Sequence, residues 1–100
     1  MFVAILLDGK KVIGFNVVSL GSLTAALVHP REVFKPAILA NAANLILAHN
    51  HPSGDPEPAA EDRAITERLR HAADLLGITV LDHVVIGDGT FRSFAEEHLI

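Results

Sequence analysis

The centre of the sequence reads Leu45-Ile46-Leu47-Ala48-His49-Asn50-His51. Its first four residues are all apolar, a run typical of a strand buried on both faces in the middle of a sheet. We expect that strand to end at His49. Residues 52–58 contain three prolines and a glycine, and this composition predicts an irregular loop.

The flanking residues predict an alternation of strands and helices around this central strand. Apolar segments rich in β-branched residues predict strands over 2–7, 12–20, 78–86 and 90–94. Helical spacing predicts one helix over 31–43, starting near Pro30 and kinked at Pro36, and a second over 59–76, ended by Gly77. Residues 21–27 are expected to connect elements, and the last six to fray. The order ββαβαββ predicts a layered α/β sandwich.

Composition excludes several classes of protein. The chain has 100 residues, of which 50% are hydrophobic and 20% charged, so a single folded domain is expected rather than disorder. The absence of Cys excludes a disulfide scaffold, a thiolate zinc finger and a cysteine nucleophile. A net charge of −4 argues against a broad basic face for nucleic acid. With no apolar run of membrane-spanning length and no secretory signal, we expect a cytoplasmic protein.

The residues with the clearest chemical potential are His49, His51 and Asp62. The two histidines are two positions apart and therefore point the same way from an extended chain. Asp62 falls in the first turn of the second expected helix, and the loop is long enough to bring that turn back against the strand end. Two imidazoles and a carboxylate suit Zn²⁺ with its fourth position open. The alternatives are a chance histidine pair and a carboxylate that only complements the helix dipole.

The sequence around these residues resembles the RadC family of bacterial JAMM-type (MPN/JAB) metalloprotease-like domains. The resemblance is carried by residues 49–56, which read His-Asn-His-Pro-Ser-Gly-Asp-Pro, and by the later pair Glu61-Asp62. It continues over nearly the whole chain, in Ser19-Leu20-Gly21, Val28-His29-Pro30-Arg31-Glu32-Val33, Leu75-Leu76-Gly77-Ile78, and Leu81-Asp82-His83 with Gly87.

The resemblance implies a three-layer αβα sandwich with a mixed sheet like that of the cytidine deaminases. It implies Zn²⁺ held by His49, His51 and Asp62, with water at the open position. It also implies that residues 1–100 form one JAMM/MPN-type domain, excised from a longer chain with a helical region ahead of it.

Two positions depart from the family pattern. The family has a Ser three residues before the metal-binding Asp, where its hydroxyl is assigned to steadying the tetrahedral intermediate; this chain has Ala59. Ser53 or Asp55 could replace that hydroxyl. The family also has a Glu upstream as general base, but no Glu precedes Glu32 here. Glu32 is better explained as a helix-start carboxylate than as this base, so the catalytic residues stay unassigned.

The other histidines and polar residues carry weaker signals. His83 lies beside Asp82 in a strand and either lines the site or is a buried structural residue. His29 is expected to cap a helix or to lie at the rim of the site. His71 is expected at the edge of a helix's apolar stripe, and His98 in the tail. Ser53 has no evident base, and Lys10-Lys11 is too short for a phosphate-binding patch.

The set of His49, His51 and Asp62, together with the family resemblance, leaves two functions open. The first is a zinc-dependent metallohydrolase that uses a metal-activated water on the amide bond of a peptide or protein. The second is a zinc-stabilised module with little or no catalysis that associates with protein or DNA; the resemblance implies this alternative because the RadC family is historically labelled with DNA repair. Net charge gives no support to nucleic-acid binding, no membrane partner is expected, and the oligomeric state is open.

Overall fold

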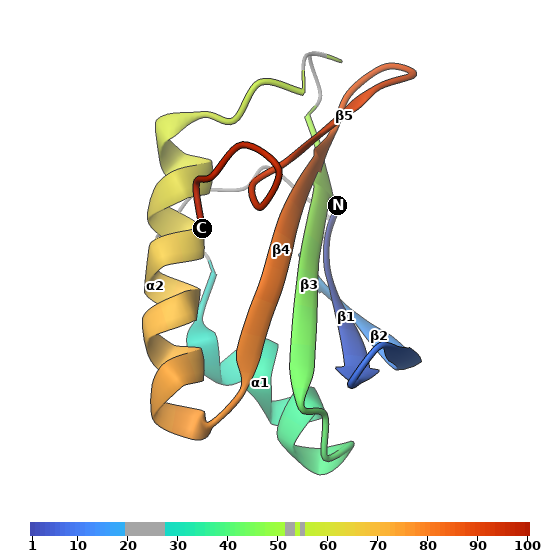
Figure 1. Cartoon of the computed structure of the whole chain (residues 1–100), viewed down its shortest axis with the longest axis vertical. Coiled ribbons are helices and arrows are strands. Elements are labelled where there is room, and N and C mark those ends of the chain that lie inside the picture. The colour runs from blue at the N-terminus through green and yellow to red at the C-terminus, as the bar shows by residue number, and fades with distance from the viewer. Residues whose placement is uncertain (20–27, 52–53, 55) are drawn as a thin grey trace.

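The computed structural model of the chain describes residues 1–19, 28–51, 54 and 56–100 (Figure 1). Its elements are β1 (Phe2–Asp8), β2 (Lys11–Ser19), α1 (Pro30–Leu39), β3 (Asn44–Asn50), α2 (Ala60–Leu76), β4 (Thr79–Ile86) and β5 (Phe91–Ser93). The predicted α/β class and the order ββαβαββ are confirmed. The expected connection over 21–27 lies outside the described residues.

The five strands form one mixed sheet in the order β2-β1-β3-β4-β5, with β3 in the middle. β3 pairs antiparallel with β1 and parallel with β4, whereas β2 and β5 are antiparallel edge strands. The strand predicted to end at His49 continues to Asn50, because His49 lies opposite Phe2 on one side and Val85 on the other. Pairing on both sides keeps these residues extended after the apolar run has ended.

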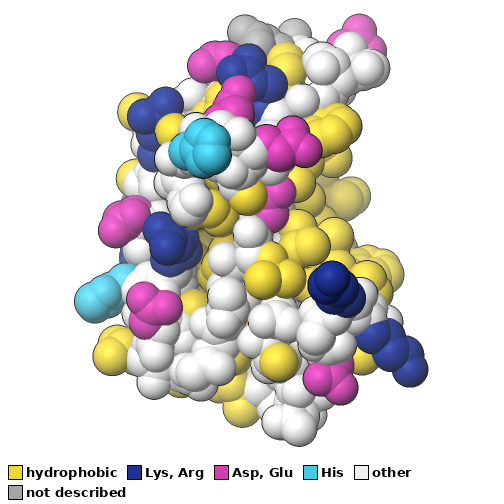
Figure 2. Space-filling view, viewed as in Figure 1, with side chains coloured by type: hydrophobic (Ala, Val, Ile, Leu, Met, Phe, Trp, Pro, Cys, Tyr) yellow, Lys and Arg dark blue, Asp and Glu magenta, His cyan; other side chains and the backbone are white. Residues whose placement is uncertain are grey.

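Both helices pack on the same face of the sheet. Val33 and Phe34 of α1 and Ile65 and Leu69 of α2 share one apolar core with inward-facing strand residues such as Leu47. In the described part of the chain the sandwich thus has one helical layer, where the three-layer form has two. The strands' opposite face carries the apolar residues Val3, Ile5, Ile46 and Val84, each partly exposed. In Figure 2, charged side chains gather over α2 and apolar ones over the strands.

Helix α1 ends at Leu39, four residues earlier than the sequence pattern predicts. The reason is local: Ala40 is the C-cap of the helix, and the next residue, Asn41, adopts a left-handed conformation with φ of 56°. Pro36 lies inside the helix and has no N–H to donate to the carbonyl of Glu32. The side-chain amide of Asn16 donates to that carbonyl instead, at 3.4 Å.

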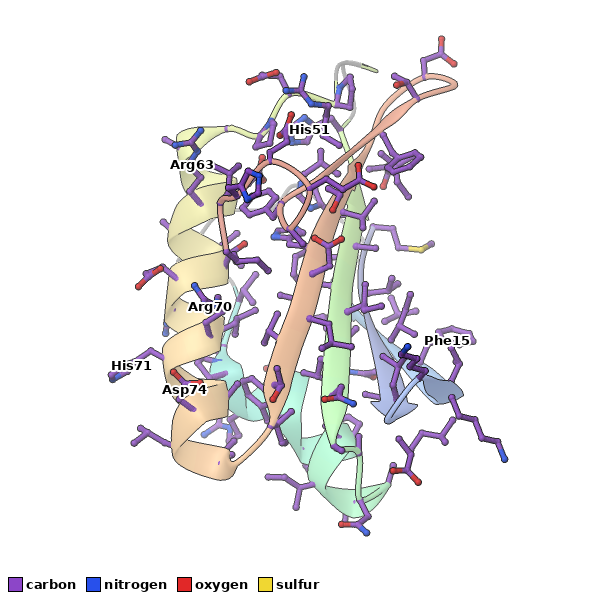
Figure 3. All side chains as sticks on the ribbon, viewed as in Figure 1. Phe15, His51, Arg63, Arg70, His71 and Asp74 are labelled. Carbon is purple, nitrogen blue, oxygen red and sulfur yellow. The ribbon has the colours of Figure 1, made fainter. Side chains whose placement is uncertain are left out.

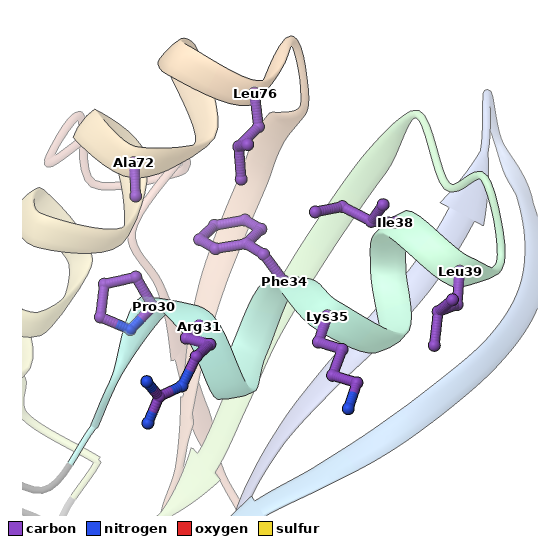
Figure 4. A pocket seen from close by; sticks show the side chains of 8 residues that line it. All are labelled: Pro30, Arg31, Phe34, Lys35, Ile38, Leu39, Ala72 and Leu76. Carbon is purple, nitrogen blue, oxygen red and sulfur yellow. The ribbon is translucent and has the colours of Figure 1, made fainter.

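Helix α2 ends as predicted at Gly77, which is left-handed with φ of 72°. Its last turn and α1 border an apolar groove of about 360 Å³ (Figure 4). Leu76 lines the groove and is 48% exposed. Neither helix within the described ranges has the length and apolar composition needed to cross a bilayer.

The C-terminal residues were predicted to fray, but in the structure they are folded against the sheet. Phe94 is 1% exposed, and the backbone N–H of Leu99 donates to its carbonyl at 2.8 Å. Arg92 also forms ion pairs with Glu97 and with Glu57, the latter at 2.7 Å. A buried aromatic ring and this turn hold the segment against the sheet.

Gly87, at the end of β4, packs directly against the loop that follows the candidate site. A Cβ added there would lie 2.4 Å from the carbonyl oxygen of Gly54 and 2.7 Å from Cδ of Pro56. The same loop is held by a hydrogen bond from the N–H of Asp88 to the carbonyl of Gly54, at 2.7 Å.

We therefore expect Gly87→Ala to lower the free energy of unfolding by about 1–3 kcal/mol, because the methyl group overpacks this contact. Urea denaturation of the two proteins measures the change. Gly14→Ala is the matched control, because its added Cβ would meet only Leu6 Cδ1 at 3.9 Å. Equal stability of Gly87→Ala and the unchanged chain would contradict the packing described.

Candidate metal centre

Two of the three predicted ligands lie at the end of the central strand. His49 projects from β3 on the helix-covered face, the same face as Leu47, and is 5% exposed. His51 follows the strand, and its backbone N–H donates to the carbonyl of Ile86 at 3.0 Å. Figure 3 shows His51 at the end of the sheet that lies beside the first turn of α2. The two imidazole centroids are 5.0 Å apart.

The third predicted ligand, Asp62, comes from the first turn of α2. One of its carboxylate oxygens, Oδ2, accepts the backbone N–H of Ala59 at 2.6 Å. That bond caps the helix start and orients the carboxylate, and the positive end of the helix dipole favours its charge. Asp62 is only 4% exposed, so the helix start carries a buried acidic group toward the sheet.

The structure brings these three side chains together. His49 Nε2 lies 2.9 Å from Asp62 Oδ1, and His51 Nε2 lies 2.9 Å from Asp62 Oδ2. One ligand atom from each residue falls within 4.8 Å of the others. His51 has the most accessible side chain of the three, 17% exposed, so this cluster is closed on the core side and approachable past His51.

Behind the cluster, His83 of β4 contacts His49. His83 Nε2 lies 2.8 Å from His49 Nδ1, and His83 Nδ1 makes a short hydrogen bond with Thr66 Oγ1. Thr66 Oγ1 also lies 2.8 Å from the backbone carbonyl oxygen of Asp62, within hydrogen-bond distance. The sequence left open whether His83 lines the site or is a buried structural residue. In the structure His83 is fully buried and also contacts His49 of the cluster.

Aromatic rings wall this region off from water. Phe94 stacks on His83 with centroids 4.7 Å apart, and Phe2 stacks on His49 at 5.7 Å. Burial, and after it the neighbouring His49, lower the pKa of His83 to about 3. Burial also lowers the pKa of His49, against the opposing attraction of Asp62. Both imidazoles are therefore neutral at pH 7.

The remaining candidates lie away from the cluster. Glu32 is exposed in the first turn of α1, and the only group of possible ligands among the described residues is His49, His51 and Asp62. His29 occupies the N-cap of α1 without a side-chain capping bond. His71 projects from the outer side of α2 (Figure 3), and His98 is exposed.

The loop candidates Ser53 and Asp55 lie outside the described residues. Ala59 is the N-cap of α2, with no side-chain oxygen to offer. The exposed pair Lys10 and Lys11 lies at the β1–β2 turn.

Sequence reasoning missed Thr66. Its hydroxyl joins His83 to the backbone of Asp62, and it is 2% exposed. A signal was present, because Thr66 follows Asp62 at the spacing of one helical turn, where side chains face the same way. The sequence could not show that a histidine from β4 would reach the same place.

The low pKa of His83 predicts acid destabilisation of the metal-free chain. The unfolded chain binds a proton on this histidine below about pH 6.5, whereas the folded chain does so only near pH 3. The contribution of His83 to the free energy of unfolding is therefore highest above pH 6.5 and falls as the pH drops toward 3. At pH 5 this contribution is smaller by about 2 kcal/mol.

Urea denaturation in chelator at pH 7 and pH 5 measures that fall. His83→Phe, which has no titrating group in the same slot, should lose about 2 kcal/mol less between the two pH values than the unchanged chain. His71→Gln, on the exposed face of α2, should behave like the unchanged chain. The assignment is wrong if His83→Phe and the unchanged chain lose stability equally.

Comparison with known proteins agrees with this geometry. The family model described as "RadC-like JAB domain" matches residues 1–99. UPF0758 proteins of Geobacter sulfurreducens and Symbiobacterium thermophilum are 57% and 58% identical to the chain over 99% of its length. A UPF0758 protein of Methanosarcina acetivorans is 50% identical over the same share. The chain spans 43–44% of the length of these relatives. It belongs to the RadC-like JAB domain family.

Proposed function

We propose that this chain is a zinc-dependent metallohydrolase domain that acts on the amide bond of a peptide or protein. The observation that carries the proposal is the convergence of His49, His51 and Asp62 with their ligand atoms within 4.8 Å of one another. Two imidazole nitrogens and one carboxylate oxygen are the donors that catalytic zinc sites use, and three protein ligands leave one position for water or substrate.

The donor set of this chain fits such an ion. Asp62 is buried and acidic, and the only charges that could balance it within the cluster are those of the two imidazoles or of a cation. Because burial keeps the imidazole of His49 neutral, its nitrogen is available as a ligand at neutral pH. Zinc in this site supplies a Lewis acid that lowers the pKa of water to about 7 and polarises a carbonyl group.

The chain's own residues hold and shield the site. The N–H of Ala59 orients Asp62, His83 orients His49, and the bond from His51 N–H to Ile86 positions the backbone of the accessible ligand. Phe2 and Phe94 exclude water from the core side. A substrate therefore approaches on the side of His51. Among the described residues no further carboxylate joins the cluster.

Ala59, which has no side-chain hydroxyl to offer a reacting oxygen, favours a second candidate function: a zinc-stabilised module that binds a protein partner and hydrolyses little or nothing. Both functions use the same metal site and differ only in turnover. Support for nucleic acid as the partner is lacking, since the chain carries a net charge of −4.

Zinc binding tests what both candidates share. We expect the purified chain to bind about one Zn²⁺, and Asp62→Asn to weaken binding by at least about 10-fold, because the substitution removes the ligand charge. Competition with a chromophoric chelator measures the affinity. Asp74→Asn, an exposed carboxylate of α2, is the matched control and should bind like the unchanged chain. No Zn²⁺ binding by the unchanged chain would overturn both candidates.

A peptide library then separates the candidates. Cleavage that disappears with chelator and in Asp62→Asn supports the hydrolase. Full zinc occupancy without cleavage of any peptide supports the binding module.

Ala59→Ser tests the missing hydroxyl. A Ser at this N-cap accepts a backbone N–H of the first turn and should stabilise the chain by about 1 kcal/mol. If the hydroxyl also steadies the reacting oxygen, the hydrolysis rate rises, by up to about 10²–10³-fold, with unchanged zinc affinity. Thermal denaturation, zinc competition and peptide cleavage measure the three quantities. Ala60→Ser, one residue into the helix, controls for a hydroxyl that cannot cap. An unchanged cleavage rate in folded, zinc-loaded Ala59→Ser would contradict the role of the hydroxyl.

A further inference from the structure

A buried series of hydrogen-bonding groups leads away from the candidate metal centre and returns to it. It runs from His49 Nδ1 to His83 Nε2 at 2.8 Å, from His83 Nδ1 to Thr66 Oγ1, and from Thr66 Oγ1 to the backbone carbonyl of Asp62 at 2.8 Å. His83 is 0% exposed and Thr66 2% exposed, so water is not an alternative partner. The series therefore starts at one proposed ligand and ends on the main chain of another.

The hydrogens in this series must all point one way. A neutral imidazole carries its hydrogen on one nitrogen and accepts on the other, and a hydroxyl has a single hydrogen to donate. If His49 accepts from His83, then His83 must accept from Thr66. If His49 donates to His83, then His83 donates to Thr66, and the Thr66 hydroxyl is left to donate to the carbonyl of Asp62. Both directions use three hydrogens, and only in the second does the Thr66 hydroxyl donate to the carbonyl of Asp62.

Without a cation, the carboxylate selects the first direction. His49 Nε2 lies 2.9 Å from Asp62 Oδ1, which only accepts, so a hydrogen on Nε2 makes a good bond there. His49 Nδ1 is then an acceptor, His83 donates from Nε2, and Thr66 donates to His83. The metal-free site is internally satisfied in this arrangement.

A cation on His49 Nε2 requires the opposite direction, because that nitrogen must then offer its lone pair. His49 carries its hydrogen on Nδ1 and donates to His83, and His83 carries its own on Nδ1 and donates to Thr66. The hydroxyl turns to the carbonyl of Asp62, which already lies within reach at 2.8 Å. The hydrogen that leaves His49 Nε2 passes to solvent and one from solvent enters at Thr66 Oγ1, so the three groups together carry three hydrogens before and after the reversal.

We propose that His83 and Thr66 are positioning residues that let His49 exchange a hydrogen for a metal ion, by reversing the direction of this buried hydrogen-bond series. The inference rests on the proposed zinc site. The Thr66 hydroxyl is the necessary part, because it can both donate to His83 and accept from it. A valine of the same shape could fill the space but could do neither, so packing alone does not require a hydroxyl here.

The tautomers of the histidines test the proposal directly in the unchanged chain. Two-bond ¹H–¹⁵N correlation spectra distinguish a protonated ring nitrogen from an unprotonated one. Without metal, we expect His49 and His83 to be protonated on Nε2. With one equivalent of Zn²⁺, we expect both to be protonated on Nδ1, although His83 does not touch the ion. His71, exposed on α2, is the internal control and should not change.

Substitution of Thr66 provides a second, independent measurement. Thr66→Val should weaken Zn²⁺ binding by about 10–100-fold, the usual effect of losing a group that orients a ligand, and should abolish the tautomer change of His83. Thr66→Ser keeps the hydroxyl and should restore both. Thr90→Val, at an exposed position, controls for loss of a threonine hydroxyl elsewhere.

The outcomes separate the two proposals. Zinc binding with no change in the tautomer of His83 overturns the proposed reversal of the hydrogen-bond series but not the proposed metal site. A folded Thr66→Val with unchanged zinc affinity has the same consequence. Failure of the unchanged chain to bind Zn²⁺ contradicts the proposed function and, with it, the proposed reversal of the hydrogen-bond series. The spectra of the unchanged chain decide the question even if Thr66→Val does not fold.

Discussion

The contact of the Asp62 carboxylate with two imidazoles is the interaction on which the site end of the structure depends. It joins the first turn of α2 to the end of β3 and thus sets where a long helix begins against the sheet. A buried carboxylate is costly unless it is compensated, and here an N–H of its own helix and two histidines surround it. The geometry that suits a metal ion is also the geometry that closes the fold at this end.

The position of β3 explains why such a contact is possible. This strand has a neighbour on each side and a helical layer on one face, so side chains leaving its carboxyl end emerge from the middle of the sheet beside the apolar core. Parallel pairing with β4 places His83 beside Leu47 and behind His49. The sheet therefore supplies two imidazoles of the cluster and the histidine behind them, whereas the helix supplies the carboxylate.

Polar groups are placed inside an apolar core without loss of hydrogen bonding. Within the described ranges, every buried side-chain nitrogen or oxygen has a partner. His83 lies between the rings of Phe2 and Phe94, yet both of its nitrogens are bonded. Such networks favour a single arrangement, because a buried polar group left without a partner would destabilise the folded state. The network thereby holds the imidazole of His49 in one place beside Asp62.

Local sequence sufficed for the features that local forces decide. The apolar run at 45–48 predicts a central strand, Gly77 predicts the end of α2, and the alternation of a strand predicts that His49 and His51 face the same way. The end of α1 was mispredicted because the apolar spacing did not show that Asn41 adopts a left-handed conformation. The folded C-terminal turn was mispredicted because the burial of Phe94 depends on what that segment packs against. Which face the helices cover and which group lies behind His49 were decided only by the tertiary structure. Strand pairing joins residues that are far apart in the chain, and no periodicity within one segment records its neighbour.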